Sequence, residues 1–188
     1  MRYSEDHKAK THQRIIDEAA RLFRRDGIGA TGLQPLMKTL GLTHGGFYAH
    51  FKSKDQLVET ALAHTAEQLK ASTDEIFAND APLPTFIRRY LSSAHCANPG
   101  DGCPLPTMSS ELGLRGQASE ITDQVVRDRL QAIEQSLDTE EAEAQSIMMI
   151  SAMVGALVLA RSVSDQQLSQ HLLKTVRQQL LEQVESTS

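Results

Sequence analysis

Apolar residues recur at helical spacing along almost the whole chain of 188 residues. No run alternates apolar and polar residues between turn signals, as a half-buried strand would. The first segment illustrates the pattern, because Ile15, Ala19, Leu22 and Phe23 fall on one stripe and Gly27 follows them. Glycine tolerates the positive φ that is common just after a helix C-terminus. The sequence therefore predicts an all-α fold of about nine helices.

The segment 28–53 is the richest in glycine and has room for only two short helices. We predict them at 33–40 and 44–51, with Gly41 in the turn between them. Thr43 is the expected N-cap of the second, because a threonine hydroxyl can accept a hydrogen bond from a free N–H of the first turn. Three helices within the first 51 residues, the last two joined by a glycine turn, predict a helix-turn-helix.

Longer helices are expected in the rest of the chain. Ser53 and Gln56 have the spacing of a capping box, which predicts the start of a helix at 54–77. Apolar spacing and turn residues then predict helices at 82–96, 104–114, 119–137, 139–163 and 165–184, with a loop at 98–102. The last two have more apolar surface than one partner helix covers. We expect a hairpin that forms a homodimer through residues 139–184, with burial inside one subunit as the alternative.

The formal charge of −5 is unevenly distributed along the chain. Residues 1–54 contain 10 Lys or Arg against 5 Asp or Glu, whereas residues 55–188 contain 9 against 19. Basic side chains that neutralise phosphates supply the sequence-independent part of DNA affinity. The N-terminal part is therefore a candidate nucleic-acid surface.

The chain has the features of a cytoplasmic protein. Its N-terminus is polar and has no apolar segment typical of a secretory signal, and it contains only 2 cysteines. The longest apolar run, 147–160, has 14 residues. This run is short for a membrane span and predicts a buried helix.

Residues 41–57 read Gly-Leu-Thr-His-Gly-Gly-Phe-Tyr-Ala-His-Phe-Lys-Ser-Lys-Asp-Gln-Leu, and residues 14–23 read Arg-Ile-Ile-Asp-Glu-Ala-Ala-Arg-Leu-Phe. Together they resemble the TetR (tetracycline-repressor) family of bacterial transcriptional regulators over about residues 10–60. The resemblance implies a DNA-binding domain at 1–53 and a ligand-binding and dimerisation domain at 54–188. It also implies a homodimeric repressor that binds a palindromic double-stranded operator and is released by a small-molecule inducer, apolar or electrophilic. The alternative is a helical ligand-binding protein that keeps the fold without specific DNA affinity.

The residues expected at the DNA lie in and around the second short helix. Thr43 is placed to contact a phosphate, and His44 and Gly45 to meet base edges in the major groove. Tyr48 and His50 resemble family positions that contact the DNA backbone. The full candidate set is Lys38, Thr43, His44, Gly45, Gly46, Tyr48, His50, Lys52 and Lys54. An ordinary solvated surface is the alternative for its histidines and lysines, whereas Phe47 and Phe51 are expected in the core.

The resemblance also implies a ligand cavity among the middle helices. The candidate lining residues are Phe86, Tyr90, Leu105, Met108, Leu112, Val125, Met148, Met149 and Met153. Methionine adapts to irregular shapes, which suits a planar or variable apolar ligand. Ordinary core packing is the alternative for each methionine taken singly.

Cys103 is a candidate sensing residue. It precedes Pro104, a favourable first helical residue, so its sulfur is expected at a helix N-terminus, where the partial positive charge favours the thiolate. The pair Gly102-Cys103 resembles a branch of the TetR family that includes sensors of electrophiles and oxidants. A buried inert thiol is the alternative.

Neither a cofactor nor an enzymatic activity is expected. A zinc site built from His95, Cys96 and Cys103 lacks a fourth ligand at a recognised spacing. A hydrolase with Cys103 as its nucleophile and His95 or His171 as its base lacks an orienting acid and an oxyanion loop.

Overall fold

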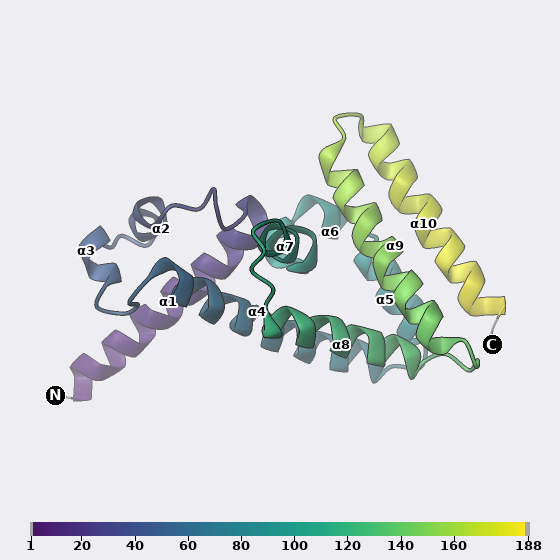
Figure 1. The fold of residues 1–188 in the computed structure, drawn as a ribbon, viewed down its shortest axis with the longest axis horizontal. Helices are drawn as coiled ribbons and strands as arrows, with labels where there is room; N and C mark the ends of the chain where they lie inside the picture. Colours follow the sequence, from purple (N-terminus) through teal and green to yellow (C-terminus); the bar gives the residue numbers. More distant parts are fainter. Residues whose placement is uncertain (1, 187–188) are drawn as a thin grey trace.

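The computed structural model describes residues 2–186, which contain ten α-helices, one short 3-10 helix and one short π-helix, and no strand. The predicted all-α class is confirmed (Figure 1). The α-helices are α1 (Arg2–Asp26), α2 (Leu33–Thr39), α3 (His44–Phe47), α4 (Lys54–Phe77), α5 (Pro82–Tyr90), α6 (Ser93–Ala97), α7 (Ser110–Leu114), α8 (Glu120–Glu134), α9 (Ala142–Ser162) and α10 (Gln166–Ser186). The 3-10 helix η1 spans Pro99–Asp101, and the π-helix η2 spans Leu105–Ser109.

The tenth helix arises because the predicted helix 82–96 is interrupted. Ser92 has an extended backbone, with φ −84° and ψ 153°, and its hydroxyl accepts a hydrogen bond from the N–H of His95 at 3.1 Å. This is an N-cap, so it ends α5 and starts α6 in a new direction. Serine inside an apolar pattern competes with the helix in this way, and the apolar spacing alone could not predict the break.

The predicted helix 104–114 is also divided, into η2 and α7. The carbonyl of Pro104 accepts hydrogen bonds from the N–H groups of Met108 at 2.9 Å and Ser109 at 3.3 Å, which widens the first turn to a π-type turn. Pro106 lacks an N–H and so cannot contribute a hydrogen bond to a regular first turn. The wide turn directs Met108 toward α1.

We use the name "head" for α1, α2, α3 and the first half of α4, which pack around a core of large side chains. Phe23, Phe47 and Phe51 are almost fully buried there, and the rings of Phe47 and Phe51 stack with centroids 5.6 Å apart. The glycines predicted to turn the chain do so, with φ of 91° at Gly27 and 71° at Gly41. The head core is therefore the one predicted from apolar spacing.

The head core also includes residues from the C-terminal part of the chain. Met108 and Leu112 are buried against the α1 and α4 side chains of the head. Both residues were expected to line the ligand cavity, and the structure places them here instead because the wide turn of η2 faces α1. Leu57 and Leu62 of α4, which follow the predicted domain boundary between residues 53 and 54, also lie in the head core. Apolar packing therefore continues across this boundary, and the division into two domains at residue 53 stays a prediction.

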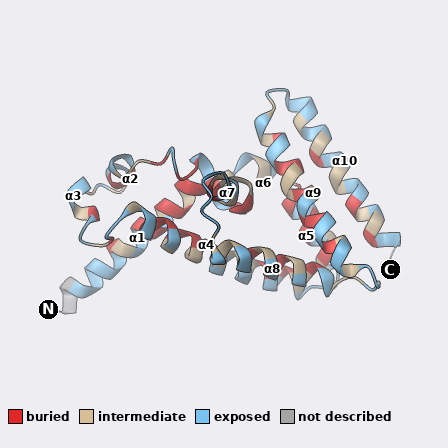
Figure 2. Ribbon diagram, viewed as in Figure 1, coloured by how far each residue is buried: buried red, intermediate tan, exposed pale blue. Residues whose placement is uncertain are grey.

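The "body" comprises the second half of α4 and α5 to α10, and α9 and α10 form the predicted antiparallel hairpin at the end farthest from α3 (Figure 1). Over 21 residues α9 is long and apolar enough to cross a membrane by length and composition, although the apolar run alone is shorter. One face of α9, including Met149, Met153 and Leu157, is buried in the body core (Figure 2). The opposite face of α9 is exposed, so the predicted buried helix is buried on one side only.

Candidate nucleic-acid interface and ligand cavity

The short helix α3 is held at its N-terminus by Thr43. The Thr43 hydroxyl accepts a hydrogen bond from the N–H of Gly46 at 3.2 Å, so the predicted N-cap is confirmed. α3 ends at Phe47 rather than at residue 51, and residues 48–50 form turns that lead into the buried Phe51. Phe47 anchors α3 on the head core, so the opposite side of α3 faces solvent.

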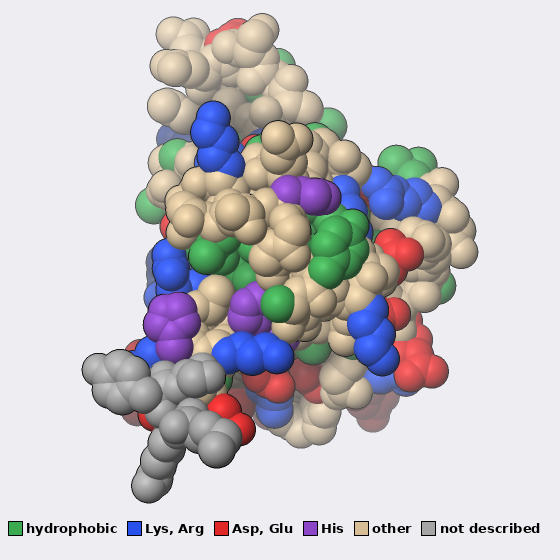
Figure 3. Space-filling model, turned by 90° about the vertical axis from the view of Figure 1, so that its left-hand side faces the viewer, with side chains coloured by type: hydrophobic (Ala, Val, Ile, Leu, Met, Phe, Trp, Pro, Cys, Tyr) green, Lys and Arg blue, Asp and Glu red, His purple; other side chains and the backbone are tan. Residues whose placement is uncertain are grey.

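The first turn of α3 presents the residues that were expected to meet DNA. Thr43, His44 and Gly45 are exposed, and a side chain added at Gly45 would meet no atom within 4 Å. Tyr48 is 60% exposed, and its ring packs edge-on against the rings of His44 and Phe47. Figure 3, which looks onto this end of the molecule, shows Lys, Arg and His side chains spread across the face.

The remaining expected DNA contacts differ in their surroundings. Lys38 and Lys52 are exposed, whereas Gly46 and His50 are half-buried. Burial lowers the pKa of His50, and the neighbouring His12 and Lys8 lower it further. His50 therefore favours the neutral imidazole, which can donate only one hydrogen bond to a phosphate.

Lys54, the last member of the candidate DNA-contact set, is bonded within the protein. Its side chain is half-buried, and its Nζ donates a hydrogen bond to the carbonyl oxygen of Ile28 at 2.5 Å. Burial and the nearby Arg115 lower the pKa of Lys54. In this conformation the ammonium group ties the start of α4 to the loop between α1 and α2.

A carboxylate from α7 joins the body to that same loop. Glu111 accepts hydrogen bonds from the N–H groups of Ile28 at 2.5 Å and Gly29 at 2.7 Å, and it forms an ion pair with Arg115. A Cβ atom on Gly29 would lie 2.7 Å from both the Glu111 carboxylate and the Arg115 guanidinium, so another residue at this position would displace these two side chains. Sequence reasoning missed this contact, and the glycines after α1 are its only local signal.

The body contains a cavity of about 400 Å³ next to α4. It is lined from α4 by Leu69, Ser72 and Ile76, from α5 by Phe86, Arg89 and Tyr90, from the segment 92–103 by Ser92, Ala94, His95, Asn98, Asp101, Gly102 and Cys103, and from α8 by Arg129. Three of the expected residues, Phe86, Tyr90 and Cys103, are thus among its lining.

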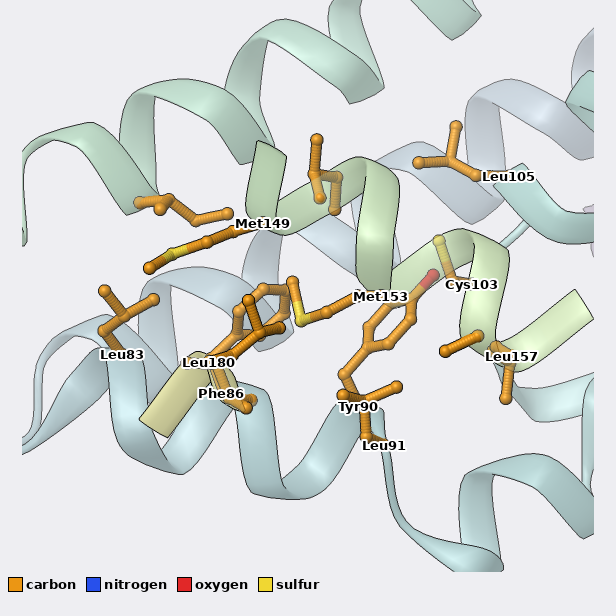
Figure 4. Packing of buried hydrophobic residues seen from close by; sticks show 14 of the residues in the cluster. Leu83, Phe86, Tyr90, Leu91, Cys103, Leu105, Met149, Met153, Leu157 and Leu180 are labelled. Atoms are coloured by element: carbon orange, nitrogen blue, oxygen red, sulfur yellow. The ribbon is translucent and has the colours of Figure 1, made fainter. Parts of the chain in front are cut away.

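Most of the other expected lining residues belong to the adjoining core. Leu105, Val125, Met149 and Met153 are buried in the same cluster as Phe86 and Tyr90, and Met153 lies next to Tyr90 (Figure 4). Met148, by contrast, is 66% exposed on the outer side of α9. The methionine-rich pattern of α9 therefore reflects core packing and an outer apolar face rather than the cavity wall.

The cavity has a charged residue that sequence reasoning missed. Arg129 is only 5% exposed, and its guanidinium lies 4.9 Å from the centroid of the Phe86 ring. Its signal in the sequence is its register, because Val125, Arg129 and Ile133 are spaced four apart and all three are buried. An arginine on the apolar stripe of a helix indicates a buried polar site.

His95 fixes the wall that carries Cys103. Its Nδ1 lies 2.7 Å from the carbonyl oxygen of Tyr90, and its Nε2 accepts the N–H of Cys103 at 3.2 Å, so the ring is neutral with its proton on Nδ1. Burial lowers the pKa of His95. Cys103 and Cys96 are both free thiols, and Cys103 is 4% exposed. The helix that follows Cys103 is only the short η2.

The same wall of the cavity touches the head. The buried Gly100 in η1 packs on α1, where an added Cβ would lie 3.0 Å from Cγ of Arg21. Asp101 faces the positive charges of Arg21 and Arg24. Residues 99–103 therefore connect the wall of the cavity to α1 of the head. Within the described range, no group of His, Cys, Asp or Glu side chains could hold a metal ion.

Residues 15–61 match the model of the family described as bacterial regulatory proteins, tetR family. This segment is a TetR-family N-terminal domain. The matched segment contains the C-terminal half of α1, all of α2 and α3, and the first turns of α4, so it lies within the head described above.

Identity to known regulators is higher over short segments than over most of the chain. The chain is 44% identical over 48 residues to the HTH-type transcriptional regulator AcrR of Shigella flexneri, a match that covers 26% of this chain and only 22% of AcrR. It is 24% identical over 169 residues to the uncharacterised regulator YxaF of Bacillus subtilis, covering 84% of this chain and 88% of YxaF. The crystal structure of the reduced form of Escherichia coli NemR superposes with a TM-score of 0.74 at 19% identity, over 91% of this chain and 95% of NemR.

Proposed function

We propose that this TetR-family protein is a cytoplasmic, homodimeric transcriptional repressor that binds a palindromic operator through α3 and is released when a small molecule occupies the body cavity. The observation that carries the proposal is the placement of α3. Its polar first turn is exposed at one end of the molecule, and Phe47 fixes it to the head core. A recognition helix that enters a major groove needs this combination.

The path from the cavity to the head supports control by a ligand. Asp101 and Cys103 line the cavity, and Gly100, directly before Asp101, packs on α1. A ligand that displaces this segment shifts α1 and hence α3. Two recognition helices in a dimer must reach groove segments roughly 34 Å apart, so a small rotation of each head abolishes the fit.

The experiment that tests the DNA-binding role is a titration of the purified protein with fragments of its own promoter region at several salt concentrations. We expect tighter binding to one fragment than to a scrambled copy, with log K falling linearly as log salt concentration rises. Equal affinity for the scrambled fragment would instead support the alternative, a ligand-binding protein that keeps the fold without specific DNA recognition.

We infer that Cys103 is the second candidate trigger, because its thiol lines the cavity and its neighbours include Tyr90, Arg129 and Arg161. Oxidation or alkylation of a thiol in this wall would move residues 99–103. We expect an electrophile such as N-ethylmaleimide to release wild-type protein from its operator and to leave Cys103→Ser bound. Cys96→Ser is the control, because Cys96 does not line the cavity. Release of Cys103→Ser by the electrophile would exclude the thiol trigger.

A further inference from the structure

The body cavity contains a buried positive charge, Arg129, that makes no ion pair among the described residues, and the carboxylates of Asp74 and Asp128 act on it only from a distance. The Nη1 atom of Arg129 is buried and has no hydrogen-bond partner in the part of the chain that the structure describes. Arginine remains protonated at any physiological pH, and a buried charge that lacks a partner is costly to the folded protein. A buried arginine without a hydrogen-bond acceptor is suited to bind a ligand that supplies this acceptor.

A second donor lines the same cavity from another helix. The hydroxyl of Tyr90 on α5 is buried and interacts with the thiol of Cys103, a weak hydrogen-bond partner, and among residues 2–186 it has no nitrogen or oxygen partner. It lies at the end of the ring that points toward the Cys103 side chain (Figure 4). Burial raises the pKa of Tyr90 well above its ordinary value, so the phenol stays protonated and available as a donor.

The rest of the lining supplies apolar walls and little negative charge. Leu69, Ile76 and Phe86 form the apolar part, and the face of the Phe86 ring already carries Arg129. Asp101 alone contributes a carboxylate among the described lining residues, and it is exposed and faces Arg21 and Arg24 on α1. The buried part of the cavity is therefore electropositive.

We propose that this cavity selects a small organic carboxylate with a flat apolar body, whose carboxylate binds Arg129 and the Tyr90 hydroxyl and whose body packs on Phe86. The proposal deepens the proposed function, since it names the ligand class of the inducer site. It replaces the neutral apolar ligand expected from the methionines, which lie in the adjoining core. An arginine and a hydroxyl that converge from two helices fit the two oxygens of a carboxylate.

The test compares an acid with its neutral amide. Isothermal titration calorimetry of the full-length protein is carried out with 2-naphthoate and 2-naphthamide, which have the same ring and nearly the same shape. We expect the wild-type protein to bind the acid at least tenfold more tightly than the amide. Arg129→Gln should lose at least tenfold in acid affinity and less than threefold in amide affinity. Tyr90→Phe should weaken acid binding by a smaller factor.

Two further variants control for charge and for folding. Arg127→Gln removes an exposed arginine from the same helix, outside the cavity, and should leave both affinities unchanged. Arg129→Lys keeps the charge and should keep the preference for the acid. Circular dichroism of each variant establishes that it is folded. If Arg129→Gln does not fold, the comparison of Tyr90→Phe and Arg129→Lys with the wild type decides the question.

Three results would overturn the proposal: equal binding of acid and amide, unchanged acid binding by folded Arg129→Gln, or no binding of either probe at millimolar concentration. The operator titration distinguishes these results from a failure of the proposed function. Acid binding that depends on Arg129 but does not release operator DNA would refute the inducer role and leave the ligand class standing. If a neutral compound releases the operator equally well from the wild type and from Arg129→Gln, the inducer role stands and the ligand class is refuted.

Discussion

Thr43 controls the shortest α-helix in the described chain with one hydrogen bond. Loss of an N-cap hydroxyl costs about 1 kcal/mol, and α3 has only four residues to compensate for it. We expect Thr43→Ala to lower the free energy of unfolding by about that amount and to weaken operator binding, both measurable by urea denaturation and DNA titration. Thr39→Ala is the matched control, because the exposed Thr39 hydroxyl only donates back to the carbonyl of Pro35. Equal effects of the two changes would contradict the capping role.

His95 makes stability depend on pH. Its pKa is lowered by burial in the folded protein, so below its ordinary value of about 6.5 the unfolded chain binds more protons than the folded one. The free energy of unfolding should therefore fall as the pH drops below about 6.5. Protonation would also remove the acceptor for the N–H of Cys103.

Urea denaturation between pH 7.5 and pH 5 measures this dependence. We expect His95→Gln to be less stable than wild type at neutral pH and to show a shallower decline on acidification. His44→Gln, at an exposed residue of α3, is the control variant. A decline as steep in His95→Gln as in the wild type would show that another group carries the pH dependence.

At the scale of elements, α7 contacts the head through the Glu111 carboxylate as well as through the buried Leu112. Glu111 accepts two backbone N–H groups of the loop that leads into α2, and hydrogen bonds to charged groups contribute about 1.5–3 kcal/mol each. We expect Glu111→Ala to cost about 2 kcal/mol or more in the free energy of unfolding. Glu134→Ala, at an exposed site on α8, should change it by less than 0.5 kcal/mol.

A second measurement separates stability from communication between head and body. If the Glu111 contact transmits the ligand signal, Glu111→Ala should still bind the operator at a temperature where it is folded but should need more inducer for release. An unchanged inducer requirement would limit Glu111 to a stabilising role.

At the scale of the whole molecule, the outer face of α9 exposes large apolar side chains that a partner subunit would bury. Ile147, Met148, Val158 and Leu159 are 40–66% exposed along it, and a Cβ added at Gly155 between them would meet no atom within 4 Å. A largely apolar face of this kind, with the exposed Ser151 within it, fits the homodimer that the sequence predicts through residues 139–184.

The double change Met148→Glu with Leu159→Glu should convert a dimer to a monomer in analytical ultracentrifugation and weaken operator binding, because half-sites must be bound together. Leu114→Glu is the control, since Leu114 is 88% exposed but lies at the end of α7 away from the hairpin. A double variant that remains dimeric would place the interface elsewhere.

Local chemistry made much of this protein predictable from its sequence. The bounds of α4, the Thr43 cap and the turns at Gly27 and Gly41 agree with the structure, because caps and positive φ depend on neighbours within a few residues. The head motif predicted the TetR family, which the match over residues 15–61 confirms. The break between α5 and α6 at Ser92 was not predicted, because the apolar pattern is the same for a serine that caps a helix and a serine inside one.

By itself, then, the sequence determined the all-α class, the helix-turn-helix head and which face of each helix is apolar. Only the tertiary structure decided what each face meets: that Met108 and Leu112 complete the head core, that Lys54 binds the carbonyl of Ile28, and that Arg129 and Tyr90 converge on one cavity. The physical reason is the distance along the chain over which each property is set. Helical periodicity records burial, which is a property of one element, whereas the partner of a buried side chain depends on how distant segments pack.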